Sequence, residues 1–165
     1  MKKPVKMVRA PNRLAALMAM PGGISAREAI RRSEAAVELL REPGLATIDA
    51  TLAAIETRFG AAAAGRDGES FEDLYRLCTA IIDSSIFLRG SGLDDAVRVF
   101  CDLVDLCSEI GRWDWPAVDV HINALRLLRG SGATMDKAQR DAVISGLVKV
   151  TRKRVGDSAS LAGAR

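Results

Sequence analysis

The sequence predicts an all-α protein, an antiparallel bundle of about five long helices with a short N-terminal helix. Aromatic residues make up only 4% of the chain, whereas alanine, leucine and arginine, which favour helices, are abundant. Apolar residues recur at intervals of three and four along most of the chain, and no segment alternates as a strand would. Short connections between the predicted helices favour antiparallel neighbours.

The 165 residues suffice for one domain with a buried core. We expect a basic N-terminal tail over residues 1–23, a helical bundle domain over 24–156 and a flexible C-terminal tail over 157–165. The tail contains the short helix, over residues 13–20, which ends at Pro21-Gly22-Gly23.

Two helices open the predicted bundle. Ser25 and Glu28 form a capping-box pattern, so one helix begins there and runs to about residue 41. Pro43 suits the first turn of a second helix, which continues to about Phe59.

The next two helices carry the clearest apolar stripes. One begins at a second capping pattern, Ser70 and Asp73, and ends near Gly90. The other spans residues 93–110, and its stripe is wide enough to pack on two sides, so we expect it to be central. The stripe of this central helix comprises Leu93, Ala96, Val97, Phe100, Leu103, Val104, Cys107 and Ile110.

Two further helices complete the bundle. Asp114 caps the first, which holds Trp115 and Pro116 in its first turn and ends at Gly130. The last runs over about residues 135–154, and its basic end is expected to complement the helix dipole.

Basic residues are concentrated at the two ends of the chain. Residues 1–13 contain five basic residues and no acidic one, and residues 149–165 contain five basic residues and one acidic one. Residues 14–148 are therefore net acidic, although the whole chain carries +3. An acidic body argues against a nucleic-acid-binding domain. One alternative function remains electrostatic: the basic tails bind an acidic partner, nucleic acid or anionic lipid, with an affinity that falls steeply with salt.

Cys78, Cys101 and Cys107 lie inside apolar helical patterns and form no Cys-x-x-Cys pair. A single histidine does not complete a convincing zinc site with them. We expect reduced thiols in the core of a cytoplasmic protein, with no metal and no cofactor. No apolar run approaches the length of a transmembrane helix.

His121, the only histidine, is the side chain best suited to transfer protons or phosphoryl groups near neutral pH. It shares the helical spacing of Val118, Ile122 and Leu125, so it lies on or beside an apolar stripe. The three residues after it provide neither the lysine nor the glycine that a phosphotransfer histidine needs nearby. Packing in the core is our main interpretation, and phosphorylation of His121 is the alternative.

Trp113 and Trp115 flank the start of the helix that carries His121. Tryptophan is enriched in interface hot spots, so both are candidate partner-binding residues. The competing interpretation is that they fill the end of the bundle.

Five segments, collinear over most of the chain, carry a family resemblance. They are residues 12–23 (NRLAALMAMPGG), 40–49 (LREPGLATID), 74–77 (LYRL), 111–113 (GRW) and 118–128 (VDVHINALRLL). These segments resemble the CheE-type chemotaxis proteins of alphaproteobacteria. The resemblance implies a small cytoplasmic helical protein linked to chemotaxis or two-component signalling. The chain is also similar in outline to histidine phosphotransfer bundles, where the register puts Thr79 near the position of the active histidine.

These observations together predict a non-enzymatic adaptor or regulator. It would bind a response-regulator receiver domain or a chemotaxis kinase through the surface of its central helix pair, helped by the basic tails. A phosphotransfer protein using His121 and an electrostatic binding module are the two alternatives.

Overall fold

A computed structural model describes residues 22–88 and 90–162, and within them the regular structure consists of helices alone. The all-α prediction is therefore confirmed. The short helix expected over residues 13–20 lies outside the described residues. The chain divides into two compact units, Met1–Leu39 and Leu40–Arg165.

The first unit contains helix α2, Ala26–Leu39. The Ser25 hydroxyl accepts a hydrogen bond from the backbone N–H of Glu28 (3.2 Å), so the predicted cap is present. The Glu28 carboxylate pairs with Arg31 (2.8 Å) and Arg32 (2.7 Å). No residue of α2 is buried. The sequence predicted this helix as part of the bundle domain of residues 24–156, whereas the compact unit that contains it ends at Leu39.

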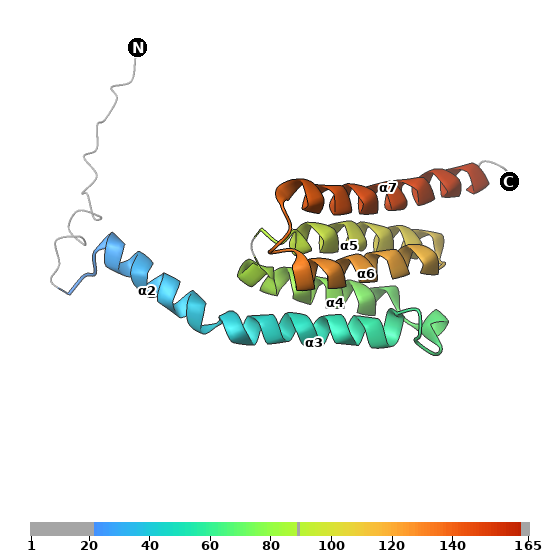
Figure 1. The fold of residues 1–165 in the computed structure, drawn as a ribbon. Coiled ribbons are helices and arrows are strands. Elements are labelled where there is room, and N and C mark those ends of the chain that lie inside the picture. Colours follow the sequence, from blue (N-terminus) through green and yellow to red (C-terminus); the bar gives the residue numbers. More distant parts are fainter. Residues whose placement is uncertain (1–21, 89, 163–165) are drawn as a thin grey trace, which may run out of the picture. The chain divides into compact units, whose positions relative to one another are not determined.

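The second unit contains five of the described α-helices (Figure 1). They are α3 (Arg41–Phe59), α4 (Phe71–Ser84), α5 (Leu93–Ile110), α6 (Trp115–Ser131) and α7 (Lys137–Ala162). Helices α3 to α6 form a ring of four, in which α3 contacts both α4 and α6, and α5 completes the ring. Helix α7 packs on α5 and α6. Successive helices run in opposite directions, as the short connections predicted.

Helix α5 is the central helix, because it contacts α4, α6 and α7. All residues of its predicted apolar stripe are buried except Ile110, which is 45% exposed. Ile110 is the last residue of the helix, and Gly111 follows it with a φ of +67° that turns the chain away. The width of the stripe thus correctly predicted the position of α5 within the bundle.

Side-chain caps begin three of these helices. The Ser70 hydroxyl and the Asp114 carboxylate each accept a hydrogen bond from the backbone N–H three residues later, at 3.4 Å and 3.1 Å, as predicted. Asp136 and Gln139 form a reciprocal capping pair before α7, with bonds of 2.8 Å and 3.0 Å. This third cap was not predicted, and it sets the start of α7 at Lys137.

Helix α7 is longer than expected and corrects one prediction. It continues to Ala162, through most of the tail predicted over residues 157–165. Its last turn contains no basic residue, so the proposed interaction of a basic end with the helix dipole is wrong. Gly156 does not end the helix, because glycine costs only about 1 kcal/mol inside a helix.

Candidate functional site

His121 is a residue of α6 and lies in the core, where α6 packs against α5 and α7. Its side chain is fully buried, and its ring stacks on Phe100 of α5 with centroids 5.3 Å apart. Nδ1 lies 2.8 Å from the carbonyl oxygen of Ala117, which can only accept, so Nδ1 carries the proton. Nε2 is then the acceptor for the hydroxyl of Thr151 on α7, at 3.3 Å. Both ring nitrogens therefore have partners.

The environment of His121 favours the neutral imidazole. Burial lowers its pKa, and the hydrogen bond to the carbonyl of Ala117 only partly opposes this effect. A phosphotransfer histidine must expose a ring nitrogen to the phosphoryl donor, and neither nitrogen of His121 is exposed. This geometry is the one expected of a packed histidine that connects α6 to α7.

Trp113 closes one end of the bundle. Its ring lies 4.3 Å from Phe71 and 5.8 Å from Phe59, measured between centroids. Its indole N–H donates to the carbonyl oxygen of Glu69 (3.2 Å), which fixes the end of the loop between α3 and α4.

Trp115 stacks on Trp113 with centroids 4.8 Å apart, and its outer face is covered by the guanidinium of Arg66 at 4.5 Å. Its indole N–H donates to the carboxylate of Asp67. Arg66 also pairs with Asp119 of α6 at 2.7 Å. Both tryptophans are half-buried and hold the loop against the bundle, so their packing role is evident in the structure.

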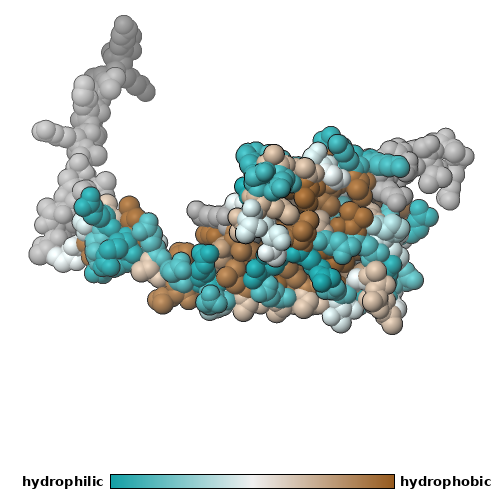
Figure 2. Space-filling view, in the orientation of Figure 1, coloured by the Kyte–Doolittle hydropathy of each residue, from teal (hydrophilic) through white to brown (hydrophobic). Residues whose placement is uncertain are grey.

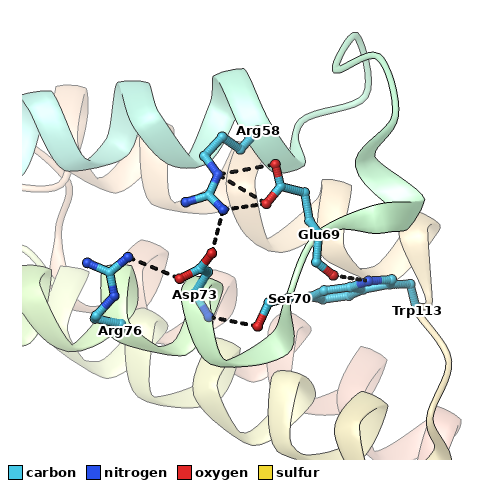
Figure 3. Close-up of polar contacts among 6 residues, drawn as sticks. All are labelled: Arg58, Glu69, Ser70, Asp73, Arg76 and Trp113. Carbon is cyan, nitrogen blue, oxygen red and sulfur yellow. Dashed lines mark hydrogen bonds and ion pairs between the residues drawn. The ribbon is translucent and has the colours of Figure 1, made fainter.

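Arg58 connects the same loop to α3 and α4 (Figure 3). Its guanidinium pairs with Glu69 at the end of the loop and with Asp73 in the first turn of α4 (2.6 Å to Asp73). Asp73 also pairs with Arg76, at 3.1 Å. The two arginines lower the pKa of Asp73, with Arg58 the larger cause, and the carboxylates raise the pKa of Arg58. The sequence did not predict this cluster of ion pairs, which ties the loop to α3 and α4.

A shallow hollow of about 170 Å³ lies between α4 and α5. We call it the Tyr75 hollow; its lining residues are Phe71, Glu72, Tyr75, Val104, Asp105 and Ser108. Tyr75 is the only tyrosine of the chain and is 43% exposed, although it follows buried Leu74 on the same helix. An exposed aromatic side chain beside partly apolar walls is a common feature of protein-binding surfaces.

The rim of the Tyr75 hollow is acidic. Glu72 and Asp105 line it, and Asp102 and Glu109 lie on the same side of α5 as Asp105. Burial raises the pKa of Asp105, and repulsion by Asp102 and Glu109 raises it further. Among residues 22–88 and 90–153, whose side chains the structure describes, none of these four carboxylates forms an ion pair.

Thr79 lies one turn after Tyr75 on α4 and is exposed. Its hydroxyl donates to the carbonyl oxygen of Tyr75 at 3.0 Å. The resemblance to phosphotransfer bundles puts the active histidine near Thr79. This position therefore lies on the surface of α4, one turn from Tyr75 and its hollow.

Two larger hollows, of about 240 and 410 Å³, lie between α3 and α6. Ion pairs cross this groove, Arg126 with Glu56 (2.6 Å) and Arg129 with Asp49 (2.7 Å), so its charges already have partners. Figure 2 shows apolar surface among polar side chains on the side where α6 and α7 lie. On α6, Val120 and Leu127 are 44% and 45% exposed. Neither region combines an aromatic side chain with carboxylates that lack an ion-pair partner among the described side chains, as the Tyr75 hollow does.

Over the described residues, no group of three or more His, Cys, Asp or Glu side chains is arranged to hold a metal ion. In the same part of the chain, no helix has both the length and the apolar character needed to cross a bilayer. No family model, curated protein or solved structure matches this chain.

Proposed function

We propose that this protein is a non-enzymatic adaptor in bacterial chemotaxis or two-component signalling, which binds a receiver domain or a kinase through the Tyr75 hollow. The observation that carries the proposal is the exposed Tyr75 on the α4–α5 helix pair, beside partly apolar walls and beside carboxylates that have no ion-pair partner among the side chains that the structure describes. The signalling context comes from the resemblance to CheE-type proteins. The two lines of support overlap only in the segment 74–77, which contains Tyr75.

The surroundings of His121 support an adaptor over a phosphotransfer protein. The imidazole is buried, and both of its nitrogens are engaged with Ala117 and Thr151. A phosphoryl group on Nε2 would displace the Thr151 hydroxyl and would require a gap between α6 and α7. Thr79 lies on the surface near the position of the active histidine in phosphotransfer bundles. A threonine hydroxyl cannot replace histidine there as the acceptor of a high-energy phosphoryl group.

The experiment is a calorimetric titration of the full chain with the purified receiver domains and chemotaxis kinases of the same cell. We expect one of them to bind, and Tyr75→Ala to weaken that binding by about thirtyfold or more, since a central aromatic side chain contributes about 2 kcal/mol or more at such surfaces. Leu127→Ala is the matched control, because Leu127 is equally exposed but lies on α6.

Two results would count against the proposal. If no receiver domain or kinase binds above background, the assignment to signalling is lost. If a partner binds and Leu127→Ala weakens it while Tyr75→Ala does not, then the binding surface is on α6 and not at the Tyr75 hollow.

A further inference from the structure

The size of the Tyr75 hollow limits what it can hold. Its volume of about 170 Å³ is below the roughly 300–1,000 Å³ of pockets that bind small molecules. Phe71 and Val104 contribute to its walls, and the Tyr75 side chain is 43% exposed beside them. The hollow therefore suits one projecting side chain of a partner protein.

The charges around the Tyr75 hollow are mainly acidic. Glu72 of α4 and Asp105 of α5 line it, and Asp102 and Glu109 lie on the same side of α5. Arg98 lies about two turns before Asp105 on that side, so four carboxylates stand against one guanidinium. An apolar partner would bury carboxylates without compensation, which costs free energy, whereas a cation offsets their charge. The surroundings of the hollow thus favour a basic side chain.

A contact elsewhere in this protein shows how a cation fits an aromatic ring beside a carboxylate. The guanidinium of Arg66 lies 4.5 Å from the centroid of the Trp115 ring and also pairs with Asp119 at 2.7 Å. A planar guanidinium can stack on a ring and still form two parallel hydrogen bonds with a carboxylate, which an ammonium group cannot. The Tyr75 hollow supplies a ring and carboxylates in the same way, and no guanidinium covers its ring among the side chains that the structure describes.

We propose that the Tyr75 hollow binds an arginine from a basic segment of the partner, with the guanidinium stacked on the Tyr75 ring and paired with Glu72 or Asp105. The inference rests on the proposed function, because it assigns a partner chemistry to the same surface. Lysine is then a weaker substitute for this arginine. The affinity falls as salt rises, because the carboxylates on the rim are exposed to solvent.

The single tyrosine of the chain gives a direct readout of this surface. The full chain is labelled with ¹³C on the tyrosine ring, and its NMR signals are followed during titration with an acetylated, amidated six-residue peptide of alternating arginine and alanine. Matched peptides carry lysine, citrulline or glutamate in place of arginine. We expect the arginine peptide to produce a saturable shift and to bind more tightly than the lysine peptide. Citrulline has nearly the shape of arginine without its charge, so the citrulline and glutamate peptides should produce no saturable shift.

Two variants test the carboxylates. Glu72→Gln and Asp105→Asn should each weaken binding of the arginine peptide by about two- to fivefold, the range expected for an exposed ion pair. Asp141→Asn is the control, because Asp141 is an exposed carboxylate on α7 that pairs with Lys137. Circular dichroism checks that each variant folds. The comparison of arginine with citrulline uses the wild type, so it remains decisive even if a variant does not fold.

Four results overturn the proposal. The first is no shift with the arginine peptide, or an equal shift with the citrulline peptide. The second is an unchanged affinity in both carboxylate variants, which would place the peptide elsewhere. The third is a shift of the ring signals with protein concentration alone, which would assign the hollow to a second copy of the chain. The fourth is a shift on replacing Arg9 and Arg13 by glutamine with no peptide present, which would assign it to the N-terminal residues of the chain itself.

The test also separates this inference from the proposed function. The peptides require no receiver domain or kinase, so specific binding of the arginine peptide would stand even if no signalling protein bound. Conversely, a receiver domain or kinase could lose affinity in Tyr75→Ala while Asp105→Asn and added salt left its binding unchanged. That result would keep the proposed function and remove the arginine.

Discussion

His121 and Tyr75, the only histidine and the only tyrosine of the chain, lie in opposite environments. The histidine is fully buried, stacks on Phe100 and has a partner for each ring nitrogen. The tyrosine is 43% exposed beside carboxylates that have no ion-pair partner in the described part of the chain. Histidine is the residue type most often associated with catalysis, but here it packs in the core. Tyr75, a residue type with no special catalytic association, is the one that lies on the surface beside carboxylates without an ion-pair partner. Surroundings, and not residue type, identify the candidate site.

The largest expected difference between the two residues is in stability. We expect His121→Ala to lower the free energy of unfolding by about 2–4 kcal/mol, because it removes a fully buried ring and leaves a cavity against Phe100. Tyr75→Ala should cost less than about 1 kcal/mol, since much of its side chain remains in water. Urea denaturation of both variants measures the difference. If both variants lost the same free energy of unfolding, His121 would contribute no more to the stability of the core than the exposed Tyr75 does.

The second difference is in pH dependence. The folded protein binds a proton on His121 more weakly than the unfolded chain, because its pKa in the fold is lowered from its ordinary value of about 6.5. The contribution of His121 to stability is therefore complete above that ordinary value. It is lost as the pH falls from there through the lowered pKa. Denaturation midpoints of the wild type and His121→Gln, compared between neutral pH and about pH 5, should converge as the pH falls. A difference between them that stays constant with pH would contradict this assignment.

The smallest expected effect lies at the Tyr75 hollow. Asp105 is repelled by Asp102 and Glu109, so Asp105→Asn should raise the free energy of unfolding by up to about 0.5 kcal/mol at neutral pH. The gain should shrink in high salt, because salt screens the repulsion. Thermal denaturation at low and high salt measures it, with Asp141→Asn as the control, since Asp141 is paired with Lys137. A loss of stability in Asp105→Asn would show that Asp105 has a stabilising role.

Local features of the fold could be predicted from the sequence. The caps at Ser70 and Asp114 involve residues three positions apart, so their geometry follows once a helix begins there. The position of His121 on the apolar side of its helix follows from the helical period. In each case the partner lies within about one turn along the chain.

Features that depend on the meeting of distant segments could not be predicted. Arg58 is separated from Glu69 and Asp73 by a loop whose path is set only when Trp113 packs on the end of the bundle. The Tyr75 hollow requires the register between α4 and α5, which no pattern within either helix specifies. In α2 an amphipathic pattern predicts a face for packing but not whether other residues cover it, and no residue of this helix is buried.

The stacking of Trp113 on Trp115 gives this protein a localised optical reporter. Both tryptophans of the chain lie at the end of the bundle that holds the loop between α3 and α4. Intrinsic fluorescence excited at tryptophan wavelengths therefore senses the local structure of this end, while far-ultraviolet circular dichroism averages over all helices. A fluorescence transition that precedes the loss of helicity would mean that the loop detaches before the four-helix ring opens, and coincident transitions would mean that the ring and the loop unfold as one cooperative unit.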